Sequence, residues 1–268
     1  MTTLGVIGNI SRDTAEHPGH QRHLLGGAAL YIALAAARAG VTAAPISVIG
    51  HDLAETLRDP QLSLLDLTGI AIAEQPSCRF HLRYDRHGTL LAVDAAYGAA
   101  QQLTAHALQP RHACEHVHVC CRRPLDPGPV LTAFVERRQP FSVDFITASA
   151  ADMIEASAPF LRHARVIFTD INEYALLTAA VPAEDLPAVT VTDGPRPAVL
   201  YRYGEVAALT PIQQAETVEV TGAGDTFTGT FLAATLHGDP DTIALRRATQ
   251  AATTRVTTKG ITLHPQPP

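Results

Sequence analysis

The residues best suited to chemistry in this chain lie in one short segment near its C-terminal end. Residues 219–231 read Glu-Val-Thr-Gly-Ala-Gly-Asp-Thr-Phe-Thr-Gly-Thr-Phe. Glycines on either side of an alanine allow a tight turn, so the pattern predicts a strand end, a turn and a helix start. The main-chain N–H groups of Gly222, Ala223 and Gly224 would then point into one space at the positive end of the helix dipole. Asp225 lies beside that space in the first helical turn, placed to accept a proton from an attacking hydroxyl.

Taken alone, this segment also fits a plain glycine-rich helix start in which Asp225 is only a cap. The composition and charge of the chain exclude or disfavour several other classes of function. The chain has a single lysine, Lys259, so a GxxxxGK[ST] phosphate loop is absent, and nucleotide phosphates would need main-chain amides, arginines or a metal ion. Its net charge of −6 disfavours nucleic acid as a partner. The first strand also lacks the GxGxxG spacing of nicotinamide-dependent oxidoreductases.

The elements around this segment alternate between strands and helices. Apolar runs predict buried strands at 4–10, 41–49, 117–120, 141–143, 166–169 and 189–192, and helix-forming stretches lie at 28–39, 129–138, 150–162, 172–180 and 241–258. This alternation predicts an α/β fold with a mainly parallel sheet covered by helices on both faces. Residues 78–84 and 89–94 instead alternate polar and apolar side chains around Asp85-Arg-His-Gly88, which predicts a β-hairpin inserted as a small lid.

Composition is that of an ordinary globular protein. The 268 residues are 46% hydrophobic and 17% charged, and no apolar run reaches the roughly 18 residues that span a bilayer, so we expect a cytoplasmic chain with no membrane partner. The four cysteines show no CxxC spacing and are expected to be reduced. Residues 112–120 place histidines and cysteines on one face of a strand. Such a set either holds a soft metal or packs, and consecutive ligands on one strand diverge, which favours packing.

The segment Thr221-Gly-Ala-Gly-Asp-Thr-Phe227 with its small-residue helix resembles the C-terminal signature of the ribokinase-like (PfkB) carbohydrate kinases. The resemblance extends over most of the chain. It implies a ribokinase-like three-layer α/β/α fold in a single domain of residues 1–268, with lid segments near 11–25 and 71–98. It also implies transfer of a phosphoryl group from ATP, with Mg²⁺, to a hydroxyl of a sugar-like or nucleoside substrate, most simply a primary alcohol. Asp225 would be the catalytic base, and edge strands of such lids favour a homodimer.

The N-terminal part resembles the substrate-binding positions of that family. Gly8-Asn-Ile-Ser-Arg-Asp13 matches a Gly-x-x-x-x-Asp pattern whose Asp binds substrate hydroxyls, which implies Asp13 as a substrate ligand. Gly26 and Gly27 match a double glycine before a small-residue helix. Tyr31 stands where the family usually has an Asn that contacts sugar hydroxyls, so the pocket should differ from that of a plain ribose kinase. Tyr31 either stacks on a substrate ring or packs.

The C-terminal half resembles the nucleotide and metal positions. Asp170-Ile-Asn-Glu173 is similar to an Asn-x-x-Glu element that organises magnesium and phosphate through water, which implies metal-organising roles for Asp170 and Glu173; without that frame the two read as a capped helix start. The implied nucleotide-contacting residues are Thr192, Gly194, Arg196 and Thr221. Residues 255–260, with Glu219 and Thr221 as partners, resemble a region that helps to hold an activating monovalent cation, so K⁺ is a further expectation.

Two alternatives stay open from the sequence. Arg122 and Arg123 follow a predicted strand and either contact an acidic or phosphorylated substrate or are solvated surface charges. A function of another class, a non-catalytic effector-binding protein on a kinase fold, is compatible with the departures at Tyr31, Asp170 and Pro197. The intact Asp225 argues against it.

Overall fold

The computed structural model describes residues 2–86, 90–109, 114–211 and 222–257. Within these ranges the main sheet has nine strands, in the order β13 (Glu205–Leu209), β12 (Val199–Arg202), β11 (Val189–Thr192), β10 (Ile167–Asp170), β9 (Phe141–Asp144), β8 (Cys114–Cys120), β1 (Thr2–Ile7), β4 (Ala43–Gly50) and β5 (Ile70–Ala73). Neighbours from β11 to β5 pair in parallel, and β12 and β13 add an antiparallel edge. The predicted mainly parallel sheet is confirmed.

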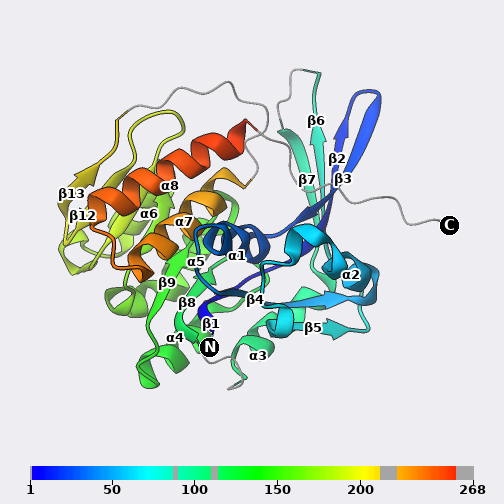
Figure 1. Ribbon diagram of the computed structural model, residues 1–268, viewed down its shortest axis with the longest axis horizontal. Helices are drawn as coiled ribbons and strands as arrows, with labels where there is room; N and C mark the ends of the chain where they lie inside the picture. The colour runs from blue at the N-terminus through cyan, green and yellow to red at the C-terminus, as the bar shows by residue number, and fades with distance from the viewer. Residues whose placement is uncertain (1, 87–89, 110–113, 212–221, 258–268) are drawn as a thin grey trace.

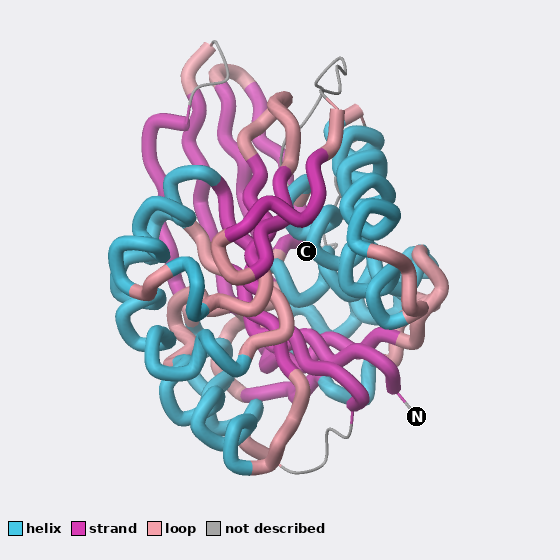
Figure 2. Tube along the Cα trace, turned by 90° about the vertical axis from the view of Figure 1, so that its left-hand side faces the viewer, coloured by secondary structure: helices cyan, strands magenta, loops and turns pink. Residues whose placement is uncertain are grey.

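Helices cover both faces of this sheet (Figures 1 and 2). One layer contains α1 (Ala28–Arg38), α7 (Ala223–Leu236) and α8 (Asp241–Val256), which share a core cluster. The other contains α3 (Leu103–Ala107), α4 (Pro127–Glu136), α5 (Ala150–Ser157) and α6 (Ile171–Ala180), with a separate cluster. The short α2 (His51–Ala54) follows β4 directly. This is the expected three-layer α/β/α fold, and none of its described helices is long and apolar enough to cross a membrane.

A second, smaller sheet stands beside the main body (Figure 1). Its described strands lie in the order β3 (His20–Gly26), β2 (Ser11–His17), β6 (Cys78–Tyr84) and β7 (Leu90–Ala96), and β2 pairs with β6 in parallel. The predicted hairpin at 78–94 is therefore present as β6 and β7. The hairpin formed by β2 and β3 has a polar sequence without regular alternation, and only the family resemblance placed a lid segment there.

Close packing of two helices depends on one glycine. Gly229 in α7 faces α1, where an added Cβ would lie 2.2 Å from the Ile32 carbonyl oxygen and 2.9 Å from the Ala35 Cβ. Distances this short are not tolerated between real side chains and backbone, so only glycine lets α7 approach α1 in this way. This contact sets the position of the helix that carries Asp225.

We expect Gly229→Ala to lower the free energy of unfolding by about 1–3 kcal/mol, because the new methyl group overpacks the interface between α1 and α7. Urea denaturation measures the change. Gly128→Ala in α4 is the control, since its new Cβ would meet only an Asp126 carboxylate oxygen at 3.4 Å. Equal stability of Gly229→Ala and the wild-type protein would contradict this account.

Candidate active site

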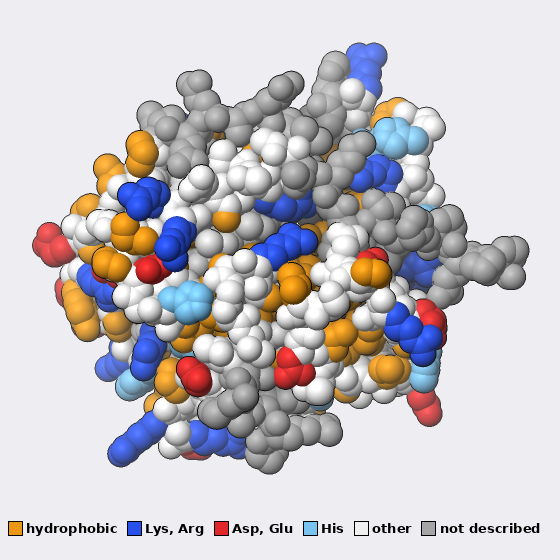
Figure 3. Space-filling view, viewed as in Figure 1, with side chains coloured by type: hydrophobic (Ala, Val, Ile, Leu, Met, Phe, Trp, Pro, Cys, Tyr) orange, Lys and Arg blue, Asp and Glu red, His pale blue; other side chains and the backbone are white. Residues whose placement is uncertain are grey.

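The carboxyl ends of β8 to β11 and the amino end of α7 meet at a cleft of about 190 Å³. Open parallel sheets place binding crevices at this edge. Four residues expected at the site line the cleft, namely Asp170, Glu173, Thr192 and Gly224, and they are joined by Arg122 and Asp144. In the space-filling view, basic side chains lie in a recess between the main body and the lid (Figure 3). The fold thus brings together residues from five separate segments of the chain.

The start of α7 has the geometry of an anion-binding turn. Gly222 is left-handed, with φ +77°, and the first helical bond runs from the Thr226 N–H to the Gly222 carbonyl oxygen. The amides of Gly222, Ala223, Gly224 and Asp225 all come before Thr226, the first intrahelical donor, so they are available to a ligand. A Cβ added to Gly224 would meet nothing within 4 Å, so open space lies in front of this turn. Thr221 and Glu219 lie outside the described residues.

Asp225 lies next to this cleft, between the lining residue Gly224 and the rest of α7, and is held by Arg122, which lines the cleft. Asp225 Oδ1 accepts a hydrogen bond from Arg122 Nη2 at 3.0 Å, and Arg122 also pairs with Asp144. The side chains of Arg122 and Asp225 are 21% and 14% exposed. Burial raises the pKa of Asp225; the Arg122 charge opposes this rise and the Asp144 charge adds to it. A buried carboxylate whose pKa is raised is a better proton acceptor than an exposed one.

The two arginines after β8 differ in environment. The prediction of a solvated surface charge is wrong for Arg122, which is enclosed between the carboxylates of Asp144 and Asp225. It is right for Arg123, whose side chain is 55% exposed and pairs with Asp152. Position directly after a parallel strand was the sequence signal that could have placed Arg122 in the site. The part played by Asp144, at the end of β9, was missed.

Asp13 lies on β2 of the small sheet, the expected lid, and one of its carboxylate oxygens is not hydrogen-bonded to the described part of the chain. Its Oδ1 is buried and has no hydrogen-bond partner among the described residues. Burial raises the pKa of Asp13 to about 6, opposed by hydrogen bonding that includes the Phe80 backbone. A Cβ at Gly26 would lie 2.0 Å from Asp13 Oδ2, and at Gly27, with φ +107°, it would lie 2.2 Å from the Asn9 carbonyl oxygen. The double glycine therefore makes room for Asp13 and for a close crossing of two chain segments.

Tyr31 is a packing residue. It is buried in α1, and its hydroxyl donates to the Leu25 carbonyl oxygen at 3.0 Å. The Arg255 guanidinium lies 5.7 Å from the ring centroid, and a Cβ at Gly222 would come within 3.3 Å of the ring. Of the two alternatives for this residue, the structure supports packing, with the ring set behind the turn that begins α7.

Asp170 and Glu173 form a capping box at the start of α6. Asp170 Oδ1 accepts from the N–H groups of Asn172 and Glu173, and Glu173 Oε2 accepts from the Asp170 N–H. The Thr147 hydroxyl lies within hydrogen-bond distance of the second oxygen of each carboxylate, and burial raises the pKa of Glu173. With these oxygens already engaged, the pair fits a hydrated Mg²⁺ held through water better than a directly ligated ion.

The other expected nucleotide residues divide between cleft and surface. Thr192 ends β11 and lines the cleft. Gly194 is left-handed, with φ +55°, in the following loop. Arg196 is exposed and pairs with Asp193 at 2.7 Å. Neither Gly194 nor Arg196 is among the described residues that line the cleft.

The histidines and cysteines of β8 are packed and hydrogen-bonded. Ligating atoms of His118, Cys120 and Asp144 lie within 4.8 Å of one another. The Asp144 carboxylate is paired with Arg122, however, and that positive charge opposes a cation at the same place. His116 and His118 both hydrogen-bond to Ser142. The geometry therefore favours packing over a metal centre here; residue 112 lies outside the described residues.

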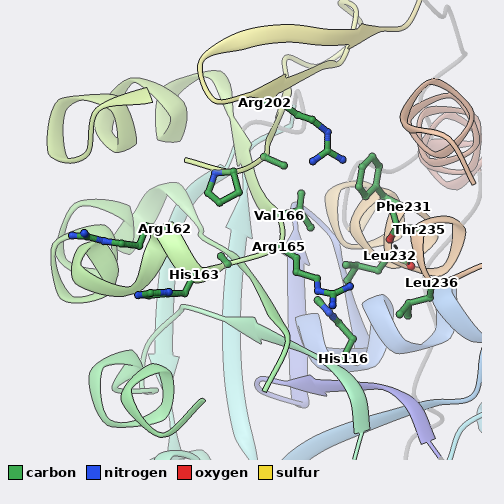
Figure 4. Close-up of a pocket in the computed structure, with 13 residues that line it drawn as sticks. His116, Arg162, His163, Arg165, Val166, Arg202, Phe231, Leu232, Thr235 and Leu236 are labelled. Carbon is green, nitrogen blue, oxygen red and sulfur yellow. Dashed lines mark hydrogen bonds between the residues drawn. The ribbon is translucent and has the colours of Figure 1, made fainter. Parts of the chain in front are cut away.

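A larger cavity of about 460 Å³ lies at the opposite, amino ends of β8, β10 and β11. Figure 4 shows Arg165 and His116 pointing toward one another at its floor, whereas Arg162 and His163 extend away from them. Arg202 lines it too and is paired with Asp241. None of the residues predicted for the site lines this cavity.

Comparison with known proteins agrees with this geometry. The family model of the pfkB family carbohydrate kinases matches residues 143–267, which include the α7 turn. The match covers just under half of the chain, and together with the fold it makes the chain similar to the ribokinase-like kinases of the PfkB family, a family of phosphotransferases.

Individual relatives narrow the class to carbohydrate and nucleoside kinases. A cytidine kinase of Thermococcus kodakarensis is 28% identical over 258 residues, 90% of this chain and 91% of the relative. The nucleoside kinase of Burkholderia thailandensis, solved with inosine, superposes with a TM-score of 0.84 at 18% identity, covering 96% of this chain and 92% of that one. An E. coli protein described as a ribokinase II, solved with ATP and Mg²⁺, superposes with a TM-score of 0.82 at 21% identity. The match covers 97% of this chain and 94% of that one.

We expect Asp13→Asn to change the pH dependence of stability. The folded protein keeps a proton on Asp13 up to about pH 6, and the unfolded chain releases it near 3.8. The contribution of Asp13 to the free energy of unfolding is therefore greatest below pH 3.8 and falls as the pH rises toward 6, by about 3 kcal/mol for about two pKa units. The neutral variant should lack this loss and be more stable than the wild-type protein at pH 7.

Urea denaturation between pH 4 and pH 8 measures the difference between the two proteins. Asp94→Asn, at an exposed carboxylate of the same lid sheet, is the matched control. Parallel stability curves for Asp13→Asn and the wild-type protein would show that burial of Asp13 has no such effect.

Proposed function

We propose that this kinase transfers the γ-phosphoryl group of ATP to the primary alcohol of a nucleoside, with Asp225 as the general base. The observation that carries the proposal is the position of Asp225. It lies at the start of α7, buried beside the cleft, and is hydrogen-bonded to Arg122. A carboxylate beside a set of free main-chain donors is what phosphoryl transfer to an alcohol requires.

The chain's own residues divide the reaction between them. Asp225 accepts the proton of the alcohol as its oxygen forms a bond to the γ-phosphorus and the bond from that phosphorus to the β-phosphate oxygen breaks. The amides of Gly222, Ala223 and Gly224 donate to the transferring group, where negative charge is spread over its oxygens. Arg122 lies next to Asp225 and adds positive charge at the same place. Positioning and electrostatics supply most of the rate enhancement in such reactions.

Asp13 and its neighbours favour a nucleoside as the acceptor. The unpartnered Oδ1 of Asp13 is suited to accept a hydrogen bond from a sugar hydroxyl. Phe80 is the residue next to Asp13 across β2 and β6, and its ring meets that of Tyr97 edge to face at 6.4 Å. An aromatic surface beside a hydroxyl-binding carboxylate suits a base joined to a ribose. The cytidine kinase relative supports the same substrate class.

The proposals that the site binds Mg²⁺ and K⁺ rest on different residues. The residues that would hold hydrated Mg²⁺ through water are Asp170 and Glu173, both of which line the cleft. When bound, the ion neutralises phosphate charge and orients the transferring group. A K⁺ site involving Glu219 and Thr221 stays a prediction, because those residues lie outside the described ranges.

A screen of acceptors tests the substrate class. Cytidine, inosine, ribose, a cyclitol and a hydroxymethyl heterocycle would each be incubated with ATP and Mg²⁺, and ADP formation measured. We expect the nucleosides to give the highest kcat/KM. Preference for ribose or the cyclitol would contradict the nucleoside proposal but leave the role of Asp225 standing.

We expect Asp225→Asn to lower kcat by about 10²- to 10⁴-fold or more, because removal of a general base costs at least that range. Nucleotide binding should survive, since the main-chain donors of the turn remain. ADP release with the best acceptor measures turnover, and calorimetry with ADP measures binding. Near-normal turnover in the variant would exclude Asp225 as the base.

A further inference from the structure

A line of buried polar side chains crosses the main sheet from the cavity of Figure 4 to Asp225. It begins at His116, whose Nε2 is 2.9 Å from Ser142 Oγ, and Ser142 Oγ is 2.8 Å from His118 Nδ1. His118 Nε2 lies 3.4 Å from Asp144 Oδ1, and Arg122 joins Asp144 to Asp225. His116, His118, Ser142 and Asp144 are all buried. Burying so many polar groups is costly unless each is satisfied by a partner.

One arrangement of hydrogens satisfies the hydrogen bonds that the two histidines make with Ser142. Burial, with the nearby His118 and Arg165, lowers the pKa of His116 to about 3, so the ring is neutral and has one N–H. That N–H can donate to Ser142, the Ser142 hydroxyl can donate to His118 Nδ1, and the remaining His118 N–H then faces Asp144 Oδ1. Asp144 Oδ1 thereby faces this N–H at 3.4 Å without a formed hydrogen bond, and Asp144 Oδ2 is paired with Arg122. The line holds Asp144 as an anion in a single orientation.

The contact between Arg122 and the two carboxylates gives Asp144 a role in the site. The same Nη2 atom of Arg122 reaches both Asp144 and Asp225. An arginine paired with Asp225 alone would hold that carboxylate firmly as an anion and weaken it as a base. A second carboxylate on the same nitrogen shares the positive charge and also fixes where the guanidinium lies.

We propose that Asp144 is a positioning residue for phosphoryl transfer, fixing Arg122 against Asp225 and sharing its charge, while His118, Ser142 and His116 hold Asp144 in place. This inference rests on the proposed role of Asp225. It assigns a function to four buried polar residues, Asp144, His118, Ser142 and His116. Without such a function, apolar side chains would fill this part of the sheet at a lower cost in free energy.

The direction of the expected pH effect follows from the groups that face Asp225. These are Arg122, Asp144, His118 and Cys120, and burial raises the pKa of the Cys120 thiol, which is therefore neutral. Arg122 lowers the pKa of Asp225 and Asp144 raises it. Removal of the Asp144 charge leaves burial alone to oppose Arg122, so the pKa of Asp225 falls and Asp225 becomes a weaker base.

Asp144→Asn tests this through the pH profile of kcat at saturating ATP and acceptor, where kcat reports the groups of the bound complex. We expect the acidic limb to move to lower pH by about one unit and the plateau kcat to fall by about tenfold or more. Asp152→Asn is the matched control, because Asp152 makes an exposed pair with the neighbouring Arg123. Asp152→Asn should leave both the acidic limb of the pH profile and the plateau kcat unchanged.

A purely structural role for Asp144 would lower the melting temperature without moving the limb, and that result overturns the proposal. If Asp144→Asn yields too little folded protein, Asp144→Glu carries the test, because it keeps the charge but displaces the carboxylate by one methylene group. We expect it to keep the acidic limb near its wild-type position and lose kcat, and a full kcat overturns the proposal. Near-normal turnover of Asp225→Asn would instead show that the proposed function itself is wrong.

Discussion

The site of this protein depends on one guanidinium group placed between two buried carboxylates. Arg122 follows β8, Asp144 ends β9 and Asp225 lies in the first turn of α7, so three elements must be in register for the contact to form. Two negative charges this close and this poorly solvated would repel strongly without the positive charge between them. The arrangement of parallel strands with their carboxyl ends at one edge is what brings the three residues together.

Much of the main sheet was predictable because its strands are buried on both faces and so read as short apolar runs. Strands β8 to β11 and helices α1, α4, α6 and α8 lie within a few residues of the predicted ranges. The antiparallel edge formed by β12 and β13 was not predicted. Its exposed residues, such as Val206 and Leu209, break the pattern expected of a half-buried strand, because packing at an edge sets less of the sequence.

Some positions of the candidate site follow from local sequence, and others follow only from contacts between distant segments. The turn at Gly222 and the position of Asp225 follow from local sequence, since glycine is needed for a left-handed residue before a helix. Arg122 contacts Asp144 and Asp225 across segments more than 20 residues apart, and a position at a strand end indicates the edge of the sheet but not these contacts. Asp170 and Glu173 were open to two interpretations, and the structure combines them, because the capping box also lines the cleft.

The crossing of Gly27 over Asn9 is one tight contact between the small sheet and the main body, and α1 starts immediately after it. Asp13, the double glycine, α1 and α7 thus form one continuous packed path that ends at Asp225, with Gly229 against Ile32 as its middle joint. This packed path runs through α1 and α7 and sets where Asp13 lies relative to Asp225. Under the proposed function, substitutions at the contact between the two helices would shift the two acids relative to each other and so change the size of alcohol that reaches both.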